Sequence, residues 1–102
     1  MPIEVNIRHA CAVNDRQNAF IRHKASVIEQ EFPDAEFVRV VIDQQRNSYL
    51  ASFEVQHKGM PIVKSEAEAD TFSIAVDAAF LKAEKQLRRH REKVISQHQR
   101  NN

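Results

Sequence analysis

The sequence contains very few residues of the kinds that form covalent cross-links or phosphate-binding loops. Among its 102 residues there is one cysteine, Cys11, and one glycine, Gly59. A single cysteine excludes an internal disulfide and a multi-cysteine zinc site, and it is consistent with a reducing cytoplasm. A single glycine excludes the glycine-rich loops that hold nucleotide phosphates. Nucleotide-dependent chemistry is therefore not expected, and Cys11 is assigned no role.

Long apolar runs are also missing. The N-terminal segment Met1-Pro2-Ile3-Glu4-Val5 has no basic region followed by an apolar one. No apolar stretch approaches the roughly 20 residues that span a bilayer. We therefore expect a cytoplasmic protein that is neither secreted nor embedded in a membrane. Apolar residues make up 42% of the chain and charged residues 28%, which is typical of one globular domain.

The chain offers little for catalysis or metal binding. No two of its five histidines have the three- or four-residue spacing that a helical zinc site uses. The remaining candidates are Cys11 with any histidine, or the carboxylates of Glu66 and Glu68. Two carboxylates that alternate on a strand are more often part of a soluble surface. We therefore predict no enzyme, no metal site, no cofactor and no small-molecule substrate.

Four segments have the patterns of β-strands. Alternating apolar residues predict a strand over about 2–9, and a β-branched run predicts a buried strand over 37–42. After a turn, a third strand runs from Tyr49 to the turn at 57–59, and a fourth runs from Pro61 to Ala69. The short connections make the last three strands an antiparallel meander, and the first can lie parallel beside one of them.

Two segments have the spacing of amphipathic helices. The first, over 15–32, is capped by Asn14 or Asp15 and closed by Pro33. Its inward stripe is Ile21, Ala25, Ile28 and Phe32. The second, over 72–96, has the stripe Phe72, Val76, Ala79, Phe80, Ala83, Leu87 and Val94. The element order predicts an α+β two-layer sandwich, β-α-β-β-β-α, in which a four-stranded sheet has two helices packed on one face. We expect one domain over 1–96 and a frayed tail over 97–102.

The second helix carries most of the charge asymmetry. Residues 82–102 hold seven Lys/Arg and two Glu, a balance of +5, whereas residues 1–81 have a balance of −4. Lys82, Lys85, Arg88, Arg89 and Lys93 fan across the expected solvent face, where like charges repel one another. Two interpretations remain open. This face binds the phosphates of a nucleic acid, or it is merely a solvated helix.

Two other residues allow more than one interpretation. Lys24 lies at the border of the first helix's apolar stripe, where its stem can pack while its ammonium reaches solvent. It could instead extend a basic surface. His90 falls on the stripe of the second helix. It is either a packed histidine hydrogen-bonded at the helix end or a contact to RNA.

Several residues together match the pattern of a known family. In the first part of the chain they are Asn14-Asp15, Phe20, Lys24, Glu29, Phe32 and Ala67-Glu68. In the second helix they are Asp77, Lys82, Lys85, Gln86, Leu87, Arg89, His90, Arg91 and Lys93, with Arg in place of Lys on either side of the histidine. Over about residues 3–95 the sequence resembles the ribosome hibernation promoting factors, also called ribosome-associated inhibitors or sigma-54 modulation proteins.

The resemblance implies an RNA-binding translation inhibitor. Members bind the small ribosomal subunit between head and body, over the decoding region, and block mRNA and tRNA sites in starved or stationary cells. Because the sequence ends at Asn102, we expect the short form, without the domain that pairs two ribosomes, and a free domain that is monomeric. The expected rRNA contacts are Arg22, His23, Lys24, Lys82, Lys85, Arg88, Arg89, His90, Arg91 and Lys93. The alternative is a protein-interaction module or transcription-related modulator, in which the acidic sheet side or the basic helix docks a protein partner.

Overall fold

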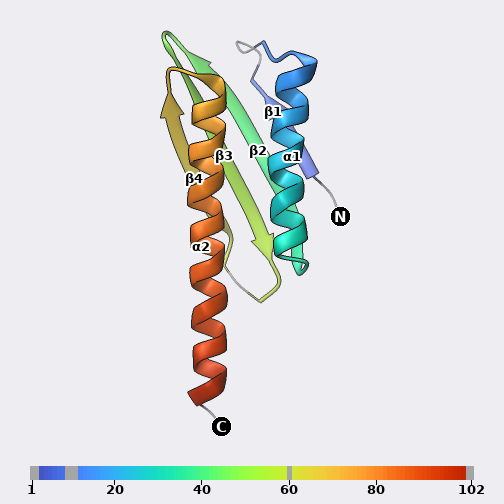
Figure 1. The fold of residues 1–102 in the computed structure, drawn as a ribbon, viewed down its shortest axis with the longest axis vertical. Coiled ribbons are helices and arrows are strands. Elements are labelled where there is room, and N and C mark those ends of the chain that lie inside the picture. Colours follow the sequence, from blue (N-terminus) through green and yellow to red (C-terminus); the bar gives the residue numbers. More distant parts are fainter. Residues whose placement is uncertain (1–2, 9–11, 60, 101–102) are drawn as a thin grey trace.

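The protein folds into one sheet covered by two helices. A computed structural model describes the backbone of residues 3–8, 12–59 and 61–100, with side chains as far as residue 92. The elements, in chain order, are β1 (Ile3–Ile7), α1 (Asp15–Glu31), β2 (Ala35–Gln45), β3 (Ser48–His57), β4 (Val63–Ala69) and α2 (Phe72–Arg100) (Figure 1). This order confirms the predicted α+β sandwich.

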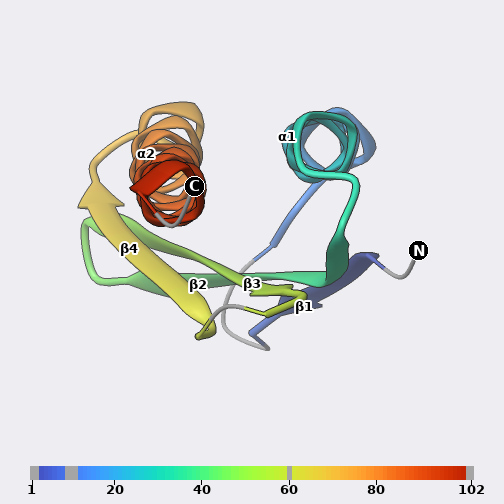
Figure 2. The ribbon, with the colours of Figure 1, turned by 90° about the horizontal axis from the view of Figure 1, so that it is seen from below.

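The four strands lie in the order β1-β2-β3-β4. β1 is parallel to β2, and the pairs β2–β3 and β3–β4 are antiparallel, as the predicted meander requires. Parallel neighbours need a crossover connection, and α1 supplies it. Figure 2 shows both helices on the same side of the sheet, with the other face uncovered. The helix side and the open sheet face are therefore two distinct surfaces.

Several boundaries differ from the prediction; β1, for example, ends at Ile7 and not at about residue 9. β2 has 11 residues, not the six of the predicted run, because its pairing with β3 continues to Gln45 opposite Ser48. The polar end of this strand lies outside the buried pattern, so periodicity does not reveal it. β4 begins at Val63, beyond Pro61, which has no amide hydrogen for a sheet. α2 continues to Arg100, beyond the predicted end. Fraying of the last six residues stays a prediction.

The core lies between the sheet and the helices, and it contains the predicted stripes. Ile21, Ala25 and Ile28 of α1 are fully buried, and Leu87 of α2 is 0% exposed. Every predicted stripe residue whose side chain is described is buried; Val94 lies outside that range. The periodicity therefore predicted the buried side of both helices correctly.

The start of α1 is fixed by a capping box. The Asn14 side chain accepts a hydrogen bond from the Gln17 amide at 2.8 Å, and the Gln17 side chain accepts one from the Asn14 amide at 3.0 Å. These bonds satisfy amide groups that the helix itself leaves without partners. Of the two predicted caps, Asn14 is therefore the one used.

Candidate nucleic-acid interface

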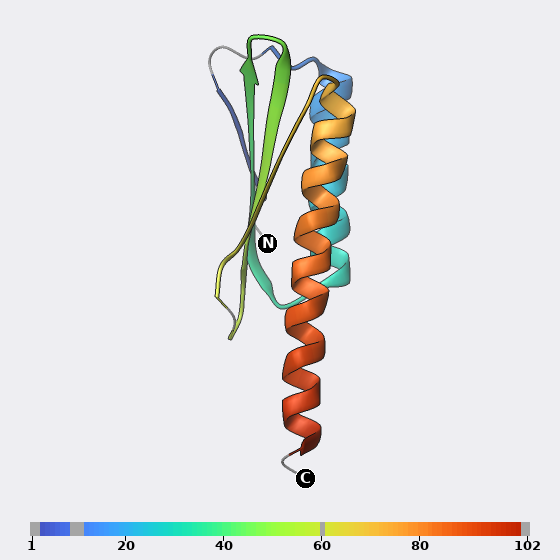
Figure 3. The same cartoon turned by 90° about the vertical axis from the view of Figure 1, so that its left-hand side faces the viewer.

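The exposed side of α2 is strongly basic. Lys82, Lys85, Arg88, Arg89 and Arg91 are all exposed, whereas Ala83 and Leu87 between them are fully buried. The predicted division of this helix into an apolar and a cationic face is correct as far as residue 92. The C-terminal part of α2 extends past the end of the sheet (Figure 3). Lys93 lies on this helix, but its side chain is outside the described range.

Two of these arginines hold the end of α1. The Arg88 Nε donates to Glu31 Oε1 at 2.6 Å, and its Nη2 lies 3.5 Å from Glu84 Oε2. Arg91 donates to the Glu31 carbonyl at 3.5 Å and lies 4.8 Å from the Phe32 ring centroid. The last turn of α1 has no basic residue of its own to balance its carbonyl groups. Arg88 and Arg91 therefore stabilise the packing of the two helices.

The pKa values of the two carboxylates around Arg88 are shifted in opposite directions. The hydrogen bond from Arg88 holds the pKa of Glu31 below its ordinary value. Burial raises the pKa of Glu84, and the neighbouring Glu31 carboxylate raises it further. Only the Glu31 carboxylate is thus favoured in its charged form by folding. Ionised Glu84 costs the folded state free energy.

We expect Glu84→Gln to stabilise the domain at about pH 7 and to give no gain at about pH 3. A raised folded-state pKa means that the penalty is absent below the ordinary pKa of 4.5, where the carboxyl is protonated in both states. The penalty is complete once the pH exceeds the folded-state value. Thermal unfolding at the two pH values measures this, with Glu92→Gln on the exposed side as control. A lower melting temperature at neutral pH would contradict it.

Lys82 is exposed but bound to the edge of the sheet. Its Nζ donates to the Glu66 carbonyl at 3.0 Å, and the Gln86 Nε2 donates to the Lys64 carbonyl at 3.4 Å. Both carbonyls belong to β4, an edge strand of the sheet. An edge strand with unpaired carbonyl groups can pair with another chain, and side chains that bind those groups oppose this. An RNA contact by Lys82 would compete with this bond.

Lys85 and Arg89 differ from these bound cations. Within the described residues neither makes an ion pair or a side-chain hydrogen bond, and both are exposed. Both line an exposed depression of about 440 Å³, together with Leu81, Glu84, Arg88 and Glu92. A phosphate could therefore bind them without displacing an intramolecular partner.

The predicted contacts on α1 fall into two kinds. Arg22 and His23 are exposed. The Lys24 Nζ lies 2.9 Å from Asp77 Oδ1, and it lies 5.4 and 4.8 Å from the ring centroids of Phe20 and Phe80. The Lys24 stem is packed as one interpretation expected, but its ammonium binds α2 instead of only reaching solvent. The Asp77 pairing was not predicted, because nothing in the sequence specifies which residues of two helices meet.

His90 is half-buried. The helix continues for ten residues beyond it, and the described residues form no hydrogen bond to its ring. The packed interpretation is therefore supported by burial alone, without the expected hydrogen bond at a helix end. Its role as an RNA contact stays a prediction.

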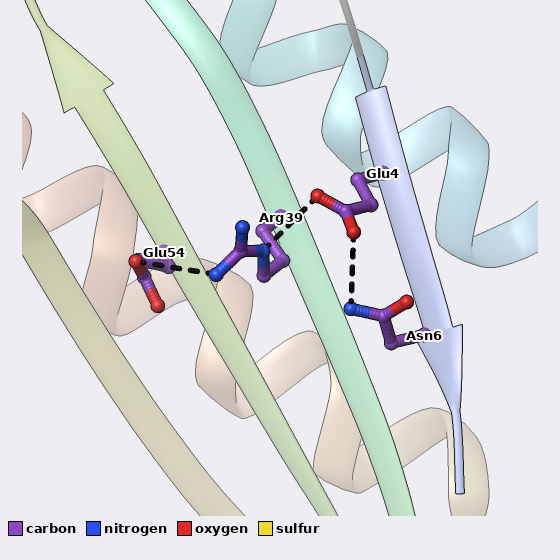
Figure 4. Close-up of polar contacts among 4 residues, drawn as sticks. All are labelled: Glu4, Asn6, Arg39 and Glu54. Carbon is purple, nitrogen blue, oxygen red and sulfur yellow. Dashed lines mark hydrogen bonds and ion pairs between the residues drawn. The ribbon is translucent and has the colours of Figure 1, made fainter.

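The open sheet face is mixed in charge with an acidic excess. Cross-strand neighbours place Arg39 between Glu4, at 3.1 Å, and Glu54, at 3.8 Å, and Asn6 donates to Glu4 at 3.4 Å (Figure 4). By strand alternation this face carries Glu4, Asp43, Glu54, Glu66 and Glu68 against Arg8, Arg39 and Lys64. Phosphates would be repelled from this face and attracted to the helix side.

Two features are absent from the described residues. Nowhere in them do three His, Cys, Asp or Glu side chains come together where they could hold a metal ion. Neither of the helices has the length and apolar character needed to cross a membrane.

Comparisons with known proteins agree with the family predicted from the sequence. A family model described as sigma 54 modulation protein / S30EA ribosomal protein matches residues 3–95. A ribosomal subunit interface protein from Coxiella burnetii superposes with a TM-score of 0.80 at 16% identity, covering 90% of this chain and 99% of that one. The Protein Y N-terminal domain from Thermus thermophilus gives 0.75 at 23% identity, covering 88% and 99%. A search of curated proteins gave no match.

The two structural matches have low sequence identity, so they support the fold alone. The family match carries the assignment, because it spans all four strands, α1 and the basic part of α2. It also includes the residues whose pattern predicted the family. The chain therefore belongs to the sigma-54 modulation protein / S30EA ribosomal protein family.

Proposed function

We propose that this protein is a cytoplasmic ribosome hibernation factor that binds the small subunit through its helix side. It lies in the decoding cleft and blocks the mRNA and tRNA sites under stress or in stationary phase. Membership in the S30EA ribosomal protein family supports association with ribosomes, and it confirms the prediction that the chain is not an enzyme. The structural neighbour from Coxiella burnetii is itself a ribosomal subunit interface protein.

The observation that carries the proposal is the basic side of α2, where Lys85 and Arg89 are exposed without intramolecular partners among the described residues. Arg22 and His23 are exposed on α1 and remain proposed as further contacts. A polyanion would relieve the repulsion among these cations and release counterions. The acidic excess on the open sheet face favours an orientation with the sheet away from rRNA. Phosphate contacts of this kind position a protein and carry little base information.

We expect binding to purified small subunits to weaken steeply with salt. Around five phosphate contacts would give a slope of about −4 in a plot of log affinity against log salt concentration. Sedimentation of labelled protein with subunits at several salt concentrations measures the slope. A slope near zero would contradict an electrostatic mechanism.

We expect inhibition of translation to be stoichiometric and competitive. One bound molecule would occupy one small subunit, so inhibition should saturate at equal amounts of protein and ribosomes, without cleavage of rRNA. In vitro translation titrated with the protein, before or after addition of mRNA and initiator tRNA, tests this. Inhibition at far below one molecule per ribosome, or inhibition unaffected by prebound tRNA, would overturn the proposal.

A second candidate is a protein-interaction module, which the acidic excess of the open sheet face favours. Glu66 and Glu68 lie there at the edge strand β4, where a basic protein partner could approach. The two functions make different predictions in the same experiment. Salt-dependent association with small subunits supports the first function, and association only with a protein partner supports the second.

A further inference from the structure

A hollow of about 350 Å³ lies between the first turns of α1 and α2, which begin at the same end of the molecule (Figure 1). It is lined by Arg16, Gln17, Phe20, Thr71, Phe72 and Ser73. Phe72 is buried and Phe20 is half-buried, while the polar residues at positions 16, 71 and 73 are exposed. The hollow therefore combines apolar aromatic walls with a polar rim, and its size suits a small planar group.

Arg16 is the one charged residue among those that line the hollow. Arg16, Phe20 and Lys24 follow one another at intervals of four residues, so they share one stripe of α1. The Lys24 ammonium lies 5.4 Å from the Phe20 ring centroid, and Arg16 lines the hollow on the preceding turn. The Gln17 Oε1 is already bound in the capping box, so a ligand could contact this side chain only through its Nε2. An anion attached to a flat aromatic group would match both the rim and the walls.

We propose that this hollow binds one unpaired base of ribosomal RNA, with the base stacked on Phe20 and its phosphate paired with Arg16. The inference rests on the proposed function, and it adds a site that reads a base. Proteins recognise RNA sequence mostly through unpaired bases that stack on aromatic side chains and pair through their edges. The Thr71 and Ser73 hydroxyl groups can donate to or accept from such an edge. Arginine is suited to phosphate, which it can bind with two parallel hydrogen bonds.

The first test compares two phenylalanines. Phe20→Leu should weaken binding to small subunits about fivefold or more, because stacking of the base is lost. The salt slope should stay unchanged, since no phosphate contact is removed. Phe20→Tyr keeps the ring and should bind like the unaltered protein. The control is Phe37→Leu, because Phe37 is also half-buried beside a cation, Arg39 at 5.3 Å, but belongs to β2.

The second test concerns the phosphate. Arg16→Gln should reduce the magnitude of the salt slope by roughly 0.7 to 1, the contribution of one phosphate contact. Arg16 is exposed, so this variant should fold normally even if Phe20→Leu does not. Lys64→Gln removes one charge from the open sheet face and should leave the slope unchanged.

The third test uses the free protein and needs no ribosome. Amide NMR spectra are recorded during titration with each of the four ribonucleoside 5′-monophosphates and with ribose 5-phosphate. At least one nucleotide should shift the amides of Phe20, Phe72 and Ser73 in a saturable way, and ribose 5-phosphate, which has the phosphate but no base, should shift them less. Equal shifts with ribose 5-phosphate, or no shifts with any nucleotide, would overturn a base site.

The outcomes separate the inference from the function on which it rests. If the unaltered protein binds small subunits but Phe20→Leu binds as well as Phe37→Leu, the base site is wrong and the proposed function stands. If the unaltered protein does not bind small subunits, the proposed function is wrong and the rRNA site falls with it.

Discussion

The double reversal Lys85→Glu/Arg89→Glu should abolish inhibition of translation by this protein. Each phosphate contact contributes roughly 0.9 to the salt slope, which corresponds to about eightfold in affinity between 1 M and 0.1 M salt. Loss of two contacts should therefore weaken binding at 0.1 M salt about sixtyfold. The two new carboxylates add repulsion at the same positions. Binding to small subunits and in vitro translation measure the effect.

Arg88 is left unchanged in this variant for a structural reason. A carboxylate in its place would face Glu31 and Glu84, so the variant would lose helix packing as well as charge. The matched control is Lys58→Glu/Lys64→Glu, which changes the net charge by the same amount at exposed residues outside α2. If the control loses as much affinity as the test variant, the interaction depends on net charge and not on the basic side of α2.

Leu87→Ala should be the most destabilising of these changes. Leu87 is 0% exposed and packs in the core beneath the basic side of α2. Removing a buried leucine side chain costs roughly 2 to 5 kcal/mol, which is a large part of the stability of a domain this small. That cost should lower the melting temperature by about 10 °C or more. Thermal unfolding followed by circular dichroism measures it.

Arg89→Ala is the matched comparison, two residues along the same helix. Its side chain is exposed, so the melting temperature should change by no more than about 2 °C. Binding to small subunits should nevertheless weaken, since a phosphate contact is lost. Similar losses of stability in the two variants would show that the faces of α2 are assigned wrongly.

The orientation of both helices could be predicted from the sequence because it depends on local spacing. In a helix the side-chain direction repeats every 3.6 residues, so the positions of Ala83 and Leu87 fix which side is buried and place Lys85 and Arg89 opposite. Strand alternation placed the apolar residues of β3 on the core side for the same reason. The start of α1 depended on its own cap, formed by two residues three positions apart.

The fold class also followed from the order of elements, but the pairing of β1 did not follow fully. A strand that returns through a helix can lie parallel beside any of several strands. In the structure β1 lies beside β2, with Val5 opposite Val40. That choice depends on how α1 packs across the sheet, which is a property of the whole core.

The fold class, the buried and cationic faces of α2, and the family could all be read from the residues in order, because these depend on periodicity, element order and local motifs. Which cations are already bound inside the molecule became visible only in the folded protein. Arg88 meets Glu31 across 57 residues, and Lys24 meets Asp77 across the helix pair, while Lys85 is left exposed. The hollow between Phe20 and Phe72 is likewise formed by two helices that are distant in the chain. Periodicity gives the angle of a side chain about its own helix, but its neighbours are set by how the helices pack together.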